Sequence, residues 1–246
     1  MVSPLKMILE ALEYLTTPCP KWVRDMGYLR EAIAIRHRAR RCHADWAQHQ
    51  TNTKDAILSA ARAYGHLPDI TILGAGLCLD VPVQDLSPLT DRLTLVDAVR
   101  LRGVRLPRNA CYLCQDIEGS ATALYAGKAP PDRPLADFQG PGLLVSVNLL
   151  SQLPLIPTRW SDDPLLGHRI LQRHVQSLRD HTGPALLIAD AMRWTLDSKG
   201  AVLSQENIAR QAGLPPPDQS WRWPIIPAHE AGKGPQIHSD VGVWHL

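Results

Sequence analysis

The sequence lacks the features that place a chain in a membrane or in the secretory pathway. It has no apolar run of about 18 residues, the length that spans a bilayer. Residues 1–15 have neither the long apolar core nor the small-residue cleavage site of a signal peptide. Cysteine is scarce, and five cysteines, an odd number in 246 residues, argue against a disulfide framework. We therefore expect a cytoplasmic protein with reduced cysteines and no membrane partner.

An excess of one charge is missing as well. The chain has 26 lysines and arginines against 24 acidic residues, so its formal net charge of +2 gives no general attraction to nucleic acid. Hydrophobic residues make up 45% and charged residues 20%, which excludes a disordered chain and fits one large globular domain.

Proline is absent from Trp22 to Tyr64, and a single glycine interrupts that segment. Apolar residues recur there at helical spacing, which predicts helices. A second helix is expected to start at a cap formed by Thr51 or Asn52 and to end at Gly65. We therefore predict a helical extension or cap over residues 1–66.

After Gly65, short apolar runs alternate with turn residues and helical stretches, the pattern of an α/β sheet. Proline-rich residues 127–141 are expected to form an irregular connection. The last two strands are joined by a loop without a long helix, which favours an antiparallel hairpin. Seven strands are predicted, over residues 70–74, 93–97, 110–115, 143–148, 185–190, 221–226 and 241–245. Helices are predicted over residues 81–89, around residue 149, and over 164–181 and 204–212.

The most informative motif follows the first predicted strand. There Gly74-Ala75-Gly76 leads towards a helix that begins near Asp80. Glycines let the backbone approach a ligand closely, and the start of a helix offers free N–H groups. The second strand ends in Asp97, about 20 residues later, where such folds bind ribose hydroxyls.

These residues resemble those of the class I, Rossmann-like S-adenosylmethionine-dependent methyltransferases. The resemblance spans roughly residues 70–246 and implies a methyltransferase domain over residues 67–246. This domain is expected to have a seven-stranded, mostly parallel sheet with helices on both faces and a terminal antiparallel hairpin. It implies S-adenosylmethionine as the cofactor and methyl transfer to an unidentified small-molecule or protein acceptor. By this resemblance the Gly74-Ala75-Gly76 loop and Asp97 hold the cofactor, and Asp116, after the third strand, lies near its adenine.

Two departures from that family concern the same loop. The family usually has an acidic residue two places before the first glycine, where this chain has Ile72, and a third glycine where this chain has Cys78. Asp80 is therefore a candidate cofactor-binding carboxylate, and its alternative role is to cap the next helix.

Candidate catalytic residues follow from the chemistry, because methyl transfer mainly requires alignment of donor and acceptor and sometimes removal of a proton. Asn148 ends the fourth strand and is a candidate contact to the cofactor and the transferred methyl, or a turn residue. Leu149 and Leu150 follow it in place of the Pro-Pro-aromatic run of amino-methylating nucleic-acid enzymes, so a nucleic-acid partner is not expected. Glu230 is a candidate general base or a solvated loop carboxylate.

Candidate acceptor-binding residues share one face of the early helices. These are Arg38, Arg41, Trp46 and His49, which would cover the cofactor cleft or form a solvated surface. Asp190 ends the fifth strand and belongs to the same ligand-binding edge. No metal is expected, because Cys111 and Cys114 are a single pair without a second pair at ligand spacing.

Two other functions remain compatible with these residues. A non-catalytic, methyltransferase-like binding or scaffold protein would explain the missing acid at Ile72 and the lack of an unmistakable catalytic motif. A nicotinamide-dependent oxidoreductase also uses a Gly-x-Gly loop and an acidic residue. The helical extension, the incomplete glycine motif and the terminal hairpin argue against it.

Overall fold

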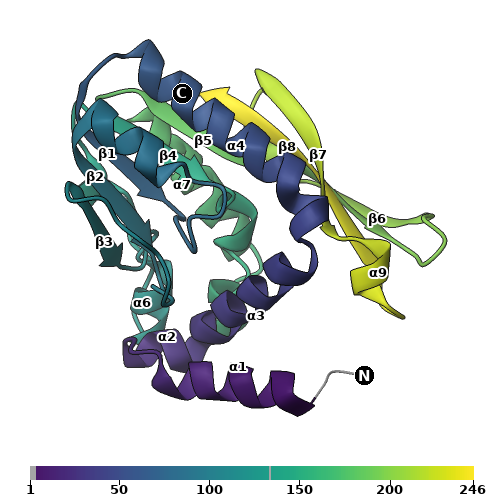
Figure 1. The fold of residues 1–246 in the computed structure, drawn as a ribbon. Coiled ribbons are helices and arrows are strands. Elements are labelled where there is room, and N and C mark those ends of the chain that lie inside the picture. Colours follow the sequence, from purple (N-terminus) through teal and green to yellow (C-terminus); the bar gives the residue numbers. More distant parts are fainter. Residues whose placement is uncertain (1–3, 133) are drawn as a thin grey trace.

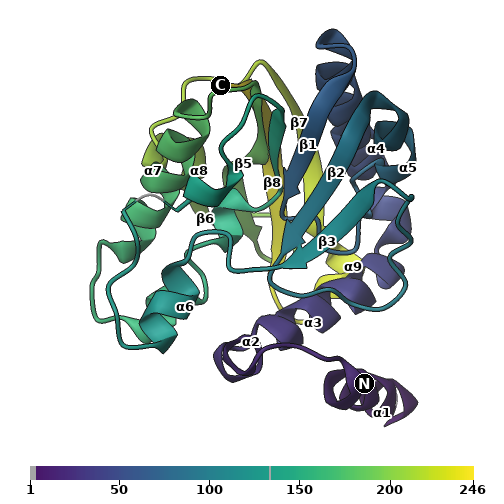
Figure 2. The ribbon, with the colours of Figure 1, turned by 90° about the vertical axis from the view of Figure 1, so that its left-hand side faces the viewer.

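A computed structural model describes residues 4–132 and 134–246 (Figure 1). Its described part begins with four helices, of which α4 packs along one face of the sheet while α1 to α3 lie beyond one edge of it (Figures 1 and 2). None of the described helices is long and apolar enough to cross a membrane. The four are α1 (Pro4–Thr16), α2 (Lys21–Met26), α3 (Tyr28–Arg41) and α4 (His43–Ala63).

The break between the two long helices lies at Cys42, so the cap expected at Thr51 or Asn52 is wrong. Residues 51 and 52 are inside α4, whose buried residues, from Trp46 to Ala61, form one continuous face against the sheet. Burial of that face outweighs the local capping preference of Thr51 and Asn52, since most helical stability in proteins comes from tertiary packing.

The sheet has the strand order β3-β2-β1-β4-β5-β8-β7. The first five strands in this order are parallel to their neighbours, whereas β8 is antiparallel to both β5 and β7. This confirms the seven-stranded, mostly parallel Rossmann-like sheet and its terminal hairpin. The strands are β1 (Leu67–Leu73), β2 (Thr90–Asp97), β3 (Ala110–Cys114), β4 (Leu143–Val147), β5 (Ala185–Leu196), β7 (Gln219–Ile226) and β8 (Gln236–His245).

An eighth strand, β6 (Val202–Asn207), pairs antiparallel with the distal half of β5. The helix predicted over residues 204–212 is therefore wrong over its first half, and only α8 (Ile208–Gln211) is helical. Every residue of β6 is exposed, so its sequence carries no burial pattern that would predict a strand. The fifth strand was predicted to end at Asp190. Strand β5 continues to Leu196, and β6 pairs with this missed part.

Short elements connect the strands, and the described residues of the proline-rich stretch 127–141 form no regular element beyond one 3-10 turn. Helices cover both faces of the sheet, with α4 and α5 on one side and α7 and α8 on the other (Figure 2). The remaining elements are α5 (Val83–Leu86), η1 (Ser87–Leu89), α6 (Ser120–Tyr125), η2 (Ala136–Phe138), η3 (Leu150–Gln152), η4 (Pro157–Trp160), α7 (Leu166–Arg179) and α9 (Ala228–Ala231).

The two faces of the sheet bury separate cores, because successive side chains of a strand point to opposite sides. Ile72 in β1 packs in the core under α4, and the adjacent Leu73 packs in the core under α7. A third cluster joins the extension to the sheet, where Leu29 and Ile33 of α3 contact Val99 just after β2. Fully burying such a side chain contributes about 1.5–3 kcal/mol, so this cluster holds α3 at the carboxyl ends of the strands.

Candidate functional site

The glycine loop connects β1 to the segment before α5, and its backbone conformation requires glycine. Gly74 and Gly76 have φ values of 83° and 48°, which side chains disfavour. A Cβ on Gly74 would lie 2.7 Å from the carbonyl oxygen of Val147, so glycine lets the ends of β1 and β4 approach closely. Cys78, at the place of the third glycine, also has a positive φ of 55°. The loop thus keeps the glycine-type conformation although cysteine replaces the last glycine.

Asp97 fixes this loop from the end of β2. Its Oδ2 accepts a hydrogen bond of 2.9 Å from the N–H of Gly76, and its Oδ1 lies 3.5 Å from the N–H of Val99. Burial raises the pKa of Asp97, and these backbone N–H groups oppose that rise. The loop and the carboxylate predicted from the sequence are therefore in direct contact.

Tyr112 in β3 contacts the same loop through the carbonyl group of Gly76. Its hydroxyl lies 2.9 Å from the Gly76 carbonyl oxygen and 3.2 Å from that of Val99. The sequence analysis did not single out Tyr112. A polar aromatic side chain in the middle of an otherwise apolar strand was the available signal, because a buried tyrosine hydroxyl usually finds a partner.

A first cavity of about 220 Å³ opens beside Asp97 and Asp116. Asp116 follows β3, and its Oδ2 accepts hydrogen bonds from the backbone N–H and the hydroxyl of Thr122, while burial raises its pKa. Leu149 and Ile156 are among the apolar residues on its wall, and Tyr28 of α3 closes it. Carboxylates in an otherwise apolar cavity suit a planar group that carries hydrogen-bond donors.

A second cavity of about 300 Å³ continues from the first along the carboxyl ends of the strands. It lies where β1 has β2 on one side and β4 on the other, the switch point at which open α/β sheets bind ligands. Both cavities share the residues Glu31, Ile35, Gly76, Leu77, Asp97, Leu149, Gln152 and Leu155.

Asn148, Asp80 and His49 meet in the second cavity. The Asn148 amide nitrogen lies 2.6 Å from Asp80 Oδ2 and 3.1 Å from His49 Nε2. His49 Nδ1 accepts a hydrogen bond of 3.0 Å from the indole N–H of Trp221, and its ring stacks on Trp223 at 3.9 Å between centroids. Burial lowers the pKa of His49 to about 4, so the ring is neutral near pH 7 with its proton on Nε2.

The proton on His49 Nε2 bears on the orientation of the Asn148 amide and on the protonation of Asp80. The N–H of His49 Nε2 needs a hydrogen-bond acceptor. The atom within its reach is the side-chain amide atom of Asn148 that also contacts Asp80. Both contacts are satisfied when the amide oxygen takes this position and Asp80 is protonated. Burial raises the pKa of Asp80, which favours the protonated carboxyl. The Asn148 side chain therefore links His49 and Asp80 through two hydrogen-bond contacts.

The candidate acceptor-binding residues separate into two groups. Trp46, His49, Arg38 and Asp190 line the second cavity, which places α3 and α4 over the carboxyl edge of the sheet. Arg41 does not line it. Instead, Arg41 Nε donates to Glu230 Oε2 at 2.7 Å, in a two-point ion pair between the α3 end and α9.

Glu230, the candidate general base, therefore lies outside both cavity walls. The Arg41 guanidinium lowers the pKa of Glu230, which weakens it as a base. Asp190 is also paired, because its Oδ2 accepts hydrogen bonds from Ser151 Oγ at 2.7 Å and from Arg193. No sequence pattern indicates this ion pair, since Arg41 and Glu230 are far apart in the chain.

No family model matches this chain, and no curated protein matches its sequence. Among solved structures it is similar to a candidate type II methyltransferase from Anaeromyxobacter dehalogenans, with 12% identity and a TM-score of 0.38 over 76% of this chain and 94% of that one. It is also similar to Burkholderia thailandensis 1,6-didemethyltoxoflavin-N1-methyltransferase with bound 1,6-didemethyltoxoflavin and S-adenosylhomocysteine. That similarity has 15% identity and a TM-score of 0.35, over 87% of this chain and 89% of that one.

Proposed function

We propose that this protein binds S-adenosylmethionine and transfers its methyl group to a small-molecule or protein acceptor. The observation that carries the proposal is the continuous pair of cavities at the switch point of the sheet. Gly76 and Asp97 line both cavities, and Gly74, Ala75 and Asn148 line the second. S-adenosylmethionine supplies an electrophilic methyl on a sulfonium, so the protein has to hold and align two reactants.

The residues of the first cavity fit the adenosine part of this cofactor. Asp97 offers carboxylate oxygens to the ribose hydroxyls, and its hydrogen bonds to Gly76 and Val99 orient it for that contact. Asp116 faces the same cavity and would accept a hydrogen bond from the exocyclic amine of adenine. Leu149 and Ile156 supply the apolar contacts that a planar base requires.

The second cavity fits the amino-acid part of the cofactor and the acceptor. Asp80 is the carboxylate that would pair with the cofactor ammonium, and Asn148 would orient polar groups beside the transferred methyl. Trp46 and Trp223 offer aromatic surface, and Arg38 contributes a cationic group. This combination favours a planar acceptor with an acidic or carbonyl substituent.

A cofactor-binding protein without catalysis is the second candidate function. Ile72 is completely buried in the core under α4, at the place where the family usually has its ammonium-binding acid. Glu230, the predicted general base, is paired with Arg41 and does not line the cavity. Both observations favour binding without turnover over the oxidoreductase alternative.

Titration calorimetry with S-adenosylmethionine tests the proposal. Asp97→Ala removes charge-assisted hydrogen bonds of about 1.5–3 kcal/mol each, so affinity should fall at least about tenfold. Asp91→Ala, an exposed position in the same strand, is the matched control and should bind as the wild type does. Absence of binding at millimolar cofactor would refute the proposal. Tight binding without release of S-adenosylhomocysteine in the presence of candidate acceptors would favour the second function.

A further inference from the structure

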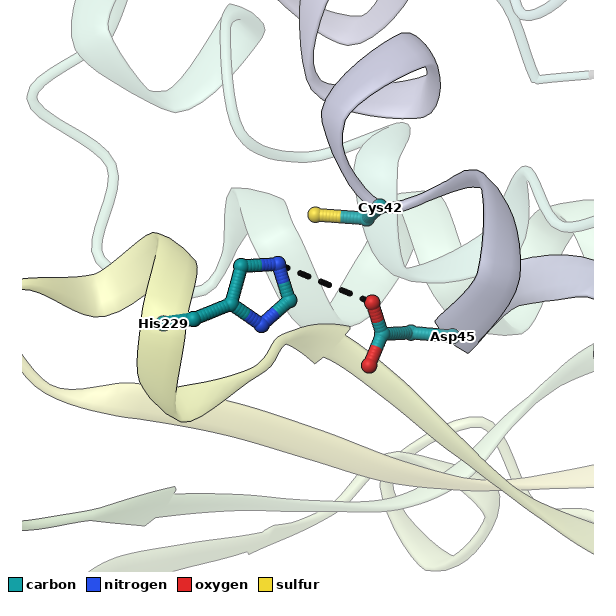
Figure 3. A group of neighbouring side chains, drawn as sticks. All are labelled: Cys42, Asp45 and His229. Atoms are coloured by element: carbon teal, nitrogen blue, oxygen red, sulfur yellow. Dashed lines mark ion pairs between the residues drawn. The ribbon is translucent and has the colours of Figure 1, made fainter.

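Three potential metal ligands from different elements converge outside the two cavities. Cys42 lies between α3 and α4, Asp45 is in the first turn of α4, and His229 is on α9. Figure 3 shows the Cys42 sulfur and the Asp45 carboxylate both facing the His229 ring. His229 Nε2 lies 3.7 Å from Asp45 Oδ2, and one ligand atom from each residue falls within 4.8 Å of the other two.

We propose that Cys42, Asp45 and His229 form a zinc site, with water as the fourth ligand. A thiolate, an imidazole and a carboxylate are the donors that zinc binds, at about 2.0–2.3 Å each. Donor atoms around a tetrahedral zinc are about 3.3–3.6 Å apart at those bond lengths. The nitrogen–oxygen distance of 3.7 Å is close to this range. The other ligand atoms lie within 4.8 Å, so metal binding requires a small rotation of the exposed His229 side chain.

The neighbouring ion pair holds these ligands in place before any metal binds. Arg41 precedes Cys42, and Glu230 follows His229, so the Arg41–Glu230 pair fixes α9 against the junction of α3 and α4. Glu230 also lies 3.9 Å from Arg38, so this carboxylate pairs with both nearby guanidinium groups.

The electrostatics of the cluster favour a divalent cation. On zinc binding, the thiol proton leaves to solvent, a sulfur–zinc bond forms and a zinc-bound water is displaced. The resulting thiolate and the Asp45 carboxylate together neutralise the two charges of the metal.

The site has a structural consequence for the second cavity. Cys42 packs in one cluster with Trp46, which lines that cavity, and with Trp223 of β7. A metal bond from Cys42 to His229 would tie α9 to the helices above the cavity. Zinc would therefore stabilise the wall that faces the acceptor, whatever the acceptor is.

Cobalt spectroscopy of the full-length, metal-free protein tests the site, because thiolate–cobalt bonds give a charge-transfer band and tetrahedral cobalt gives intense visible bands. We expect both with one equivalent of Co²⁺, and their loss on addition of Zn²⁺. Cys42→Ser should remove the charge-transfer band, and His229→Ala should weaken cobalt binding at least tenfold. The matched controls His43→Ala and Cys111→Ser, both at exposed positions, should behave as the wild type does.

His229→Ala is the decisive variant, because His229 is exposed and its removal leaves the buried core intact, whereas Cys42 is fully buried. Zinc at one equivalent should raise the thermal midpoint of the wild type and of His43→Ala, and leave that of His229→Ala unchanged. A wild type without the charge-transfer band, or a His229→Ala protein that binds cobalt as tightly as the wild type, would overturn the site. Neither measurement involves S-adenosylmethionine, so its outcome is independent of the proposed function.

Discussion

At the scale of single residues, the contacts of the Gly74-Ala75-Gly76 loop come from three strands. The N–H of Gly76 contacts Asp97 of β2, its carbonyl contacts Tyr112 of β3, and Gly74 lies against the end of β4. The Gly-x-Gly motif and Asp97 could be predicted from the sequence because each lies at the end of an apolar strand. Tyr112 was not, since its partner is a backbone carbonyl that only the folded sheet brings into reach.

Tyr112→Phe tests the contribution of that hydroxyl. The ring stays in place while the hydrogen bond to the loop is lost, which should cost about 0.5–1.5 kcal/mol of unfolding free energy. Affinity for S-adenosylmethionine should fall severalfold, because the loop that carries Gly76 is less well fixed. Urea unfolding and calorimetry measure the two effects. Tyr64→Phe, at an exposed tyrosine, is the control, and equal effects of both substitutions would contradict this role of Tyr112.

Asp80 gives a prediction about pH. Burial raises its pKa, so the free protein keeps this carboxyl protonated to a higher pH than an ordinary aspartate. A cofactor ammonium beside Asp80 stabilises the ionised form, so binding should release a proton and tighten as pH rises through that raised pKa. Calorimetry in two buffers with different ionisation enthalpies measures the proton. Asp80→Asn should abolish the release, and an unchanged release in this variant would exclude Asp80 as its source.

At the scale of elements, a buried hydrogen-bond network ties the segment after β3, which carries Asp116, to the sheet. Ser146 Oγ of β4 lies 2.8 Å from His174 Nε2 of α7, and His174 Nδ1 pairs with Glu118, two residues after Asp116. All three side chains of this network are buried. The network therefore joins β4, α7 and the segment that carries Asp116.

Removing one member of the network should leave a buried polar atom without a partner. Ser146→Ala should lower the unfolding free energy by about 1–3 kcal/mol, the cost of an unsatisfied buried group. Ser220→Ala, at an exposed position in β7, should change it by less than about 0.5 kcal/mol. Chemical unfolding of both variants is the measurement, and indistinguishable midpoints would show that the network does not stabilise the fold.

The elements also show where sequence patterns are informative. Strand β4 is buried throughout, and the second halves of β1 and β2 are mostly buried and apolar, so the positions of these strands were predicted to within a few residues. Strand β6 is entirely exposed and was mistaken for part of a helix. The break at Cys42 was missed because it depends on packing between α4 and the sheet, and neither glycine nor proline marks it.

At the scale of the whole molecule, the N-terminal helices and the sheet share their cores. Ile57, Ala60 and Ala61 of α4 belong to the main core with Ile70 and Ile72 of β1. The predicted boundary between residues 66 and 67 separates a cap from the sheet in sequence, while α4 packs with α5 on one side of the sheet (Figure 2).

We therefore expect residues 67–246 alone to lack a cooperative unfolding transition. Without α4, the apolar face of β1 and β2 is exposed to water. The folded state then loses the burial free energy of several side chains, about 1.5–3 kcal/mol each. Circular dichroism during urea unfolding, compared with the full chain, measures this. A sharp transition in the shortened chain would show that the sheet domain folds without its helical extension.

A crystal structure with S-adenosylhomocysteine tests the central claim most directly, because that ligand places ribose, adenine and sulfur in one experiment. We predict the ribose hydroxyls within hydrogen-bond distance of the Asp97 carboxylate, the adenine beside Asp116, and the sulfur towards Asn148 and the cavity that Trp46 lines. A ligand bound away from the Gly74-Ala75-Gly76 loop, or a soaked crystal without ligand at millimolar S-adenosylhomocysteine, would contradict the assignment of this edge as a methyl-donor site.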